Sequence, residues 1–168
     1  MIRIIKIFLF LFLFNFTYLN ANEKITYLDI DVVIQNTIKG KLILKDLDLF
    51  KNQNNKDFKS REEKIRSREN DLINKKNILS KEEFESNFVK LKKDMDIFNK
   101  DRKDKNIEFQ KKRKSMLDDL LKKITPLIER YVKDNSISLV LNKNNIFIGD
   151  KKFDITNDII NIVDKNIK

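Results

Sequence analysis

Apolar residues recur at helical spacing along the first half of the chain, but they are sparse. The last four of the set recur every seven residues: Ile43, Leu47, Phe50, Phe58, Ile65, Leu72 and Leu79. A seven-residue repeat keeps one stripe of a helix against a partner helix. Because the later heptads hold one apolar residue each, the pattern predicts a long helix with a thin hydrophobic seam.

A second helical pattern begins at Ser80. Ser80 and Glu83 have the spacing of a capping box, in which each side chain accepts a hydrogen bond from a backbone N–H at the start of a helix. The apolar stripe that follows is dense, thins to a single aromatic residue and then recovers: Phe84, Phe88, Leu91, Met95, Phe98, Phe109, Met116, Leu120 and Ile124. The first helix should therefore end near Leu79 and the second begin at Ser80. A short connection favours antiparallel neighbours, so a helical hairpin is expected.

Both flanks of this hairpin carry other patterns. Residues 24–29, KITYLD, alternate and are rich in β-branched and aromatic residues, which predicts a short strand before helical spacing resumes at about Asp31. Residues 137–148, ISLVLNKNNIFI, place two apolar runs around NKNN and predict a β-hairpin. Ile155, Ile159 and Val163 then recur at helical spacing, with Thr156 as the expected N-cap.

Pro126 falls inside the second helical pattern. Proline lacks a backbone N–H and its ring crowds the preceding turn. We therefore expect it either to kink the helix or to end it before a shorter continuation to Asp134.

Together these patterns predict an α+β fold in which a long antiparallel helical hairpin, residues 41–124, projects from a small β-rich body formed by residues 22–40 and 125–168. A two- or three-stranded sheet with open edges is marginally stable by itself. Self-association would cover it, so an obligate homo-oligomer is expected. The body residues expected at the oligomer base are apolar strand residues: Ile25, Tyr27, Leu139, Leu141, Ile146 and Ile148.

Residues 1–21 have the form of an export signal. Arg3 and Lys6 precede an apolar run over residues 7–14, and Ala21 supplies a small residue at the expected cleavage site. The run is shorter than the roughly 20 residues that a membrane-spanning helix needs. A cleaved signal is the expectation, and an uncleaved anchor is the alternative.

Charge is unevenly distributed. The chain carries a formal net charge of +10, and 37% of its residues are charged. Residues 98–114, FNKDRKDKNIEFQKKRK, hold eight Lys and Arg against three Asp and Glu, where the apolar seam is thinnest. The residues expected to contact an anionic or client partner are the cations of this stretch: Arg102, Lys103, Lys105, Lys111, Lys112, Arg113 and Lys114.

The polarity of these rods has two interpretations. One interpretation is a soluble coiled coil, which needs a charged surface. Soluble surfaces, however, usually mix positive and negative side chains rather than carry one sign of charge. A cationic rod with few apolar residues also suits weak, many-point contact with a large flexible partner. An exported cationic protein has little access to nucleic acid, so lipid head groups, lipopolysaccharide and acidic proteins are the anions that it would meet.

The residue inventory excludes most catalytic sites. The chain contains no Cys and no His, which removes the usual zinc ligands, thiol nucleophiles and Ser-His-Asp triads. Two isolated glycines, Gly40 and Gly149, cannot form a phosphate-binding loop. Carboxylate pairs remain, but acidic residues in so charged a chain are usually solvated surface. We expect a protein that is not an enzyme and uses no cofactor or metal.

Both ends of the expected mature chain resemble the Skp/OmpH family of periplasmic chaperones. The opening, ITYLDIDVVIQNTIKGK, is similar to the family's short strand, Asp and helix turn leading to Gly40-Lys41. The close, ISLVLNKNNIFIGDKKFDITNDII, resembles the family's final hairpin and its DIT helix start at residues 154–156. Lys151-Lys152 departs from a turn that commonly contains Pro in the family.

The resemblance implies a homotrimer in which three helical tentacles enclose a cavity. It implies ATP-independent holding of unfolded outer-membrane β-barrel proteins in the periplasm. Two other functions stay open: binding of lipopolysaccharide or an anionic membrane surface through residues 111–114, and a purely structural coiled-coil role in the envelope.

Overall fold

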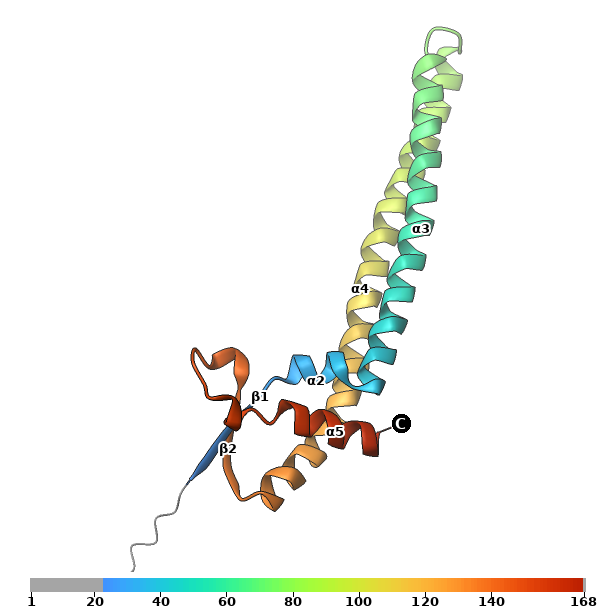
Figure 1. Ribbon diagram of the computed structural model, residues 1–168. Coiled ribbons are helices and arrows are strands. Elements are labelled where there is room, and N and C mark those ends of the chain that lie inside the picture. Colours follow the sequence, from blue (N-terminus) through green and yellow to red (C-terminus); the bar gives the residue numbers. More distant parts are fainter. Residues whose placement is uncertain (1–22, 168) are drawn as a thin grey trace, which may run out of the picture.

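The protein was analysed as a computed structural model, which describes residues 23–167. A long pair of helices rises from a small base in which both ends of the described chain meet (Figure 1). The expected signal peptide, residues 1–21, lies outside the described residues.

The order of elements matches the α+β hairpin expected from the sequence. The elements are β1 (Lys24–Leu28), α2 (Ile30–Asn36), α3 (Ile38–Asn74), α4 (Lys81–Asp134), β2 (Ile137–Asn142), the 3₁₀ turns η1 (Lys143–Asn145) and η2 (Lys151–Phe153), and α5 (Thr156–Asn166). Helices α3 and α4 pack against each other along the hairpin, whereas the strands and α5 lie at its root (Figure 1).

The capping box at the tip of the hairpin is confirmed. The Ser80 side chain accepts a hydrogen bond from the Glu83 backbone N–H, and the Glu83 carboxylate accepts one from the Ser80 N–H at 3.1 Å. These hydrogen bonds lower the pKa of the Glu83 carboxyl below its ordinary value. Helix α3 ends at Asn74, so residues 75–79 form the turn that reverses the chain.

Helix α4 continues through Pro126 to Asp134, so the expectation that Pro126 ends the helix is wrong. A proline inside a helix removes one backbone hydrogen bond. One face of the helix just before it is packed, because Ile124 is 0% exposed and Leu120 is 2% exposed. Burial of this face holds the helix together across the missing bond.

The predicted β-hairpin over residues 137–148 is wrong in its second half. Strand β2 ends at Asn142 and pairs with β1, and the two strands run parallel. The predicted turn needed Asn in the left-handed backbone region, but Ser136 is the single non-glycine residue with positive φ in the described part of the chain. Residues 143–145 instead form a 3₁₀ turn, in which the Ile146 N–H donates to the Lys143 carbonyl.

Thr156 is not the N-cap of α5 but its first residue. Its hydroxyl accepts a hydrogen bond from the Asp29 N–H at 3.0 Å and thereby joins the start of α5 to the end of β1. Ile155 is the N-cap and makes no side-chain capping hydrogen bond, but the Asp154 carboxylate accepts the Thr156 N–H at 3.0 Å. Lys143 contacts the other oxygen of Asp154 at 3.1 Å.

The hydrophobic core lies where the hairpin meets the base. It combines residues of every element except the 3₁₀ turns: Leu28, Val33, Ile34, Ile43, Leu47, Leu120, Ile124, Ile137, Ile155, Ile159 and Val163. Helix α5 is also tied to α4, because the Tyr131 hydroxyl donates to Asp158 at 2.7 Å. Burial, this hydrogen bond and the Asp158 charge raise the pKa of Tyr131 to about 12.

A sharp elbow between α2 and α3 sets the direction of the hairpin. Sequence patterns predicted one helix from about Asp31, whereas the structure breaks it at Thr37. The Thr37 hydroxyl accepts the Gly40 N–H at 3.3 Å, and Asp164 of α5 accepts the Ile38 N–H at 2.7 Å. The first turn of α3 is therefore capped by two side chains, one of them from the far end of the chain.

Replacement of Gly40 should disrupt this elbow. A Cβ atom at Gly40 would lie 1.7 Å from the Ile34 carbonyl oxygen, a backbone atom that cannot move without shifting α2. We expect Gly40→Ala to lower the free energy of unfolding by about 3 kcal/mol, at the upper end of overpacking effects. Urea unfolding followed by circular dichroism measures it. The exposed neighbour Lys41→Ala is the control, and equal stability of the two variants would contradict the assignment.

Stability should depend on the ionisation of Asp154. Burial opposes its charged form, but hydrogen bonds from Thr156 and Lys143 outweigh burial and lower the pKa of Asp154 below the ordinary 3.8. A lowered pKa in the folded state means that the stabilisation is present above the ordinary value and is lost as pH falls through the folded value. The stability difference between wild type and Asp154→Asn should therefore shrink as urea unfolding is repeated from about pH 6 down to about pH 2. A difference that does not change with pH would refute this.

Candidate functional site

The seam between α3 and α4 is built from separated aromatic layers. Phe58 and Phe98 meet edge to face with ring centroids 5.9 Å apart, and Phe50 and Phe109 stack at 6.4 Å. Aromatic pairs at such distances attract each other beyond their buried area. These two Phe pairs supply the apolar packing between α3 and α4 in the middle of the hairpin.

Ion pairs join the helices between and beyond these layers. Arg61 contacts Asp101 at 2.8 Å, and Arg68 contacts Asp94 one heptad nearer the tip. The Arg61 guanidinium also lies over the rings of Phe58 and Phe98, at 5.9 and 5.6 Å. Cations over aromatic faces gain additional attraction. Ion pairs therefore alternate along the outer seam with apolar residues such as Ile65 and the buried Leu91.

Sequence reasoning missed this ion-pair ladder, although a signal was present. Arg61 and Arg68 are seven residues apart, and so are Asp94 and Asp101. In an antiparallel hairpin two such spacings bring each Arg opposite an Asp. Only apolar residues had been assigned to the heptad seam.

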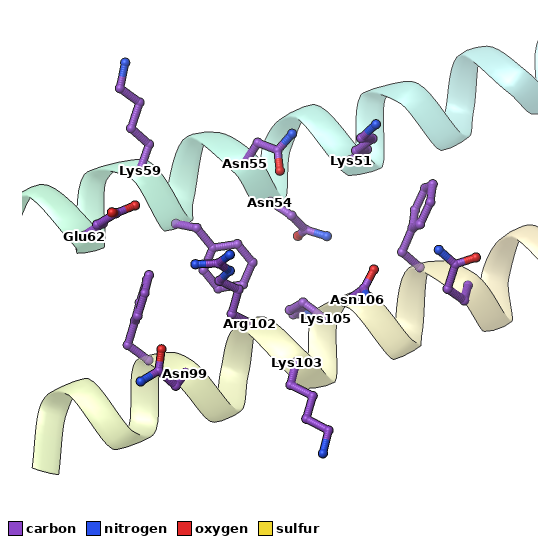
Figure 2. Close-up of a pocket in the computed structure, with 14 residues that line it drawn as sticks. Lys51, Asn54, Asn55, Lys59, Glu62, Asn99, Arg102, Lys103, Lys105 and Asn106 are labelled. Atoms are coloured by element: carbon purple, nitrogen blue, oxygen red, sulfur yellow. The ribbon is translucent and has the colours of Figure 1, made fainter.

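A groove opens on one face of the hairpin between the two aromatic layers (Figure 2). It has a volume of about 820 Å³. Asn54 of α3 and Asn106 of α4 point into the space between the helices, and Arg102 reaches from α4 toward α3 (Figure 2). Lys59 and Lys103 extend away from that space at the rim (Figure 2). The groove exists because two Phe pairs separate the helices and the residues between them do not fill the gap.

The predicted contact residues of α4 do not lie together, because they line two different hollows of the hairpin. Arg102, Lys103 and Lys105 line this groove. Lys111 and Lys112 instead line a second hollow beside Glu108. The structure therefore brings three of the seven cations to one groove.

The four consecutive cations of residues 111–114 have different surroundings. Lys112 contacts Asp46 at 3.0 Å and lies 4.9 Å from the Phe50 ring centroid, so it belongs to the seam. Lys114 pairs with Asp118 on its own helix, whereas Arg113 is exposed. Successive helical residues lie about 100° apart, which spreads such a run around the helix.

Four of the predicted base residues lie next to each other in the sheet. Ile25 is directly opposite Leu139, and Tyr27 is opposite Leu141. Ile25, Leu139 and Leu141 are 40–48% exposed, whereas Tyr27 is buried. The Tyr27 hydroxyl donates to the Asp150 carbonyl at 3.2 Å.

The remaining base residues lie beyond the sheet. Ile146 is half-buried after η1, and Ile148 is 84% exposed. Sequence reasoning missed Phe147, which is 98% exposed beside it. Large apolar residues exposed together usually mark a surface that another molecule covers.

Among residues 23–167, no group of three or more acidic residues is placed to hold a metal ion, and no helix is long and apolar enough to cross a membrane. The surfaces that stand out are thus the cationic hairpin with its groove and the exposed apolar base.

Comparisons with known proteins agree on one family. The model of the family described as outer membrane protein (OmpH-like) matches residues 24–163. A crystal structure of a proposed outer membrane chaperone (OmpH-like) from Caulobacter crescentus superposes with a TM-score of 0.75 and 14% sequence identity, covering 87% of this chain and 86% of that one. A search of curated proteins gave no match. At this identity the structural likeness establishes the fold.

The ladder predicts a measurable coupling between Arg61 and Asp101. Reversing either charge, by Arg61→Asp or Asp101→Arg, places like charges on the seam, and the double reversal restores attraction. Both groups are partly exposed, 33% and 43%, so solvent screens the pair and we expect a coupling of at most about 1 kcal/mol. Urea unfolding of the four proteins measures it, with less coupling at high salt. The exposed pair Glu62 and Arg66, 3.9 Å apart within α3, is the control, and equal coupling in both pairs would contradict a role in the seam.

Proposed function

The chain belongs to the OmpH-like family of outer membrane proteins, and from this we infer that it is a chaperone which holds unfolded outer-membrane β-barrel proteins in the periplasm without ATP. The observation that carries the proposal is a hairpin of two long helices with a sparse seam and a strongly cationic surface. Such a rod offers many weak contacts rather than one shaped site. That suits a partner without fixed structure.

We propose that three copies assemble through their bases. A two-stranded sheet is too small to be stable with its face open. Ile25, Leu139 and Leu141 leave that face apolar and exposed, and Phe147 in the segment after β2 is exposed as well. Burial of these residues among three bases would stabilise the sheet and direct three hairpins around a common cavity.

The hairpins would hold a client through charge and scattered apolar contacts. Positive charge attracts acidic segments over about 10 Å at ordinary salt concentration. Exposed apolar residues along the hairpin, such as Phe88 and Ile97, add small increments of binding. Many weak contacts keep the client from aggregating without selecting a sequence. No catalytic step enters this proposal, and export by residues 1–21 would place the protein in the periplasm.

Binding of lipopolysaccharide or an anionic membrane surface is the second candidate. This candidate depends on the basic run over residues 111–114 as the lipid-binding patch. Pairing of Lys112 with Asp46 and of Lys114 with Asp118 leaves that run without a continuous free cationic patch. Client holding is therefore the better supported function.

The first prediction of the chaperone proposal is a complex of defined mass. Light scattering of residues 22–168 should give three times the mass of one chain, because the apolar bases associate. Addition of a β-barrel protein diluted from urea should raise the mass by one client and suppress its precipitation. Residues 22–168 in which Leu139 and Leu141 are replaced by Asp should lose both effects, since charges would face each other in the base.

Two outcomes would contradict the proposal. A monomer with full secondary structure would refute the assembly. A trimer that leaves the client to precipitate, while it binds lipopolysaccharide micelles, would favour the lipid-binding candidate.

A further inference from the structure

The two faces of the hairpin carry opposite charge at the same height. The groove face is lined by four cations and one carboxylate: Lys51, Lys59, Glu62, Arg102 and Lys103. Lys105 lies at the boundary, because it lines both hollows and its ammonium contacts Glu108 at 2.7 Å. On the other side of the Phe58 layer, a smaller hollow is lined by Arg61 and four carboxylates: Asp57, Asp101, Asp104 and Glu108. The sequence showed an excess of positive charge in residues 98–114, and the structure places cations and carboxylates of the middle hairpin on different sides of it.

The groove combines an apolar floor with amide side chains. Phe58, Phe98 and Phe109 line it from the two aromatic layers, and Phe98 is 7% exposed. Five amide side chains surround them: Asn54, Asn55, Asn99, Asn106 and Gln110. An amide offers both a donor and an acceptor, as a peptide group does. The groove can therefore satisfy the free N–H and C=O groups of an extended chain while aromatic or aliphatic side chains rest on the Phe rings.

The charge of the groove selects among extended chains. Lys51 and Arg102 contribute positive charge beside the amides, so a segment with carboxylates is favoured over one with Lys or Arg. A lipid head group would satisfy the cations but would leave the amide side chains and the Phe rings without matched partners. A volume of about 820 Å³ accommodates a short peptide segment.

We propose that this groove is a binding subsite for an extended, acidic segment of unfolded polypeptide that carries aromatic or aliphatic side chains. This subsite rests on the proposed chaperone function and specifies where on the hairpin the client binds. In the assembly, the groove face of each hairpin turns toward the client and the carboxylate-rich face turns away.

Single introduced thiols test which face meets the client. The chain has no native Cys, so each variant has one labelling position. Asn55→Cys and Asn99→Cys place a photoreactive maleimide at the groove, and Asp57→Cys and Asp104→Cys place it on the other face. With an unfolded β-barrel protein bound, the groove positions should crosslink to it several-fold more. Equal crosslinking from both faces, in a complex that still keeps the client soluble, would overturn the groove and leave the chaperone function standing.

A peptide titration tests the groove separately from client holding. The probe is a short synthetic peptide that alternates Phe and Asp, compared with its Phe and Lys counterpart. The variant Lys51→Gln, Lys59→Gln, Arg102→Gln should weaken binding of the acidic peptide about tenfold, the sum of three exposed charge contacts. The control variant Lys64→Gln, Lys90→Gln, Lys111→Gln removes the same charge outside the groove and should retain most of the affinity.

Two outcomes of this titration would overturn the subsite: equal loss in both variants, and equal affinity for the two peptides. Protection of the Asn55→Cys and Asn99→Cys thiols from labelling by lipopolysaccharide micelles but not by peptide would also overturn it. If the β-barrel client precipitates even in the presence of wild-type protein, while the peptide still binds in a groove-dependent way, the chaperone proposal is refuted and the subsite is retained.

Discussion

Packing of the hairpin root against α2 and α5 is the contact on which the rest of the structure depends. Val33, Ile124, Ile159 and Val163 are all 0% exposed there, whereas most side chains of the outer hairpin are accessible. A pair of helices with so few apolar contacts gains little from its own seam. The root supplies the buried surface that fixes both helices at one end, and the hydrogen bond from Ile38 to Asp164 aligns the first turn of α3 with α5.

Beyond the root, the hairpin is held by contacts that specify register more than they add stability. The aromatic layers and the Arg61 and Arg68 ion pairs each match one residue of α3 to one residue of α4. A slip by one residue would break all of them together. Exposed ion pairs contribute little free energy, so the outer hairpin remains easier to distort than the root. In the proposed chaperone, a hairpin of that kind can adjust to clients of different size.

The same sparse seam creates the groove. Dense apolar packing between Phe50 and Phe58 would have closed the space that Asn54 leaves open. Neighbouring positions then carry amides and cations on one side and carboxylates on the other. Weak packing, polarised charge and the proposed client subsite thus fall in one stretch of the hairpin, since each follows from polar residues at positions where a coiled coil would place Leu.

The sequence alone determined the helical hairpin, the capping box at Ser80 and the α+β class, because these follow from spacing and from contacts between near neighbours in the chain. It also predicted six residues of an oligomer base, and within one chain four of them are exposed while Tyr27 is buried and Ile146 half-buried: Ile25, Leu139, Leu141 and Ile148. Tertiary structure decided the rest. The parallel pairing of β1 with β2, the hydrogen bond from the Asp29 N–H to Thr156, the contact of Asp164 with the first turn of α3 and the two charged faces each depend on residues far apart in sequence. Local patterns of apolar and polar residues carry no information about partners that are distant in sequence, because those residues come together only when the whole chain has folded.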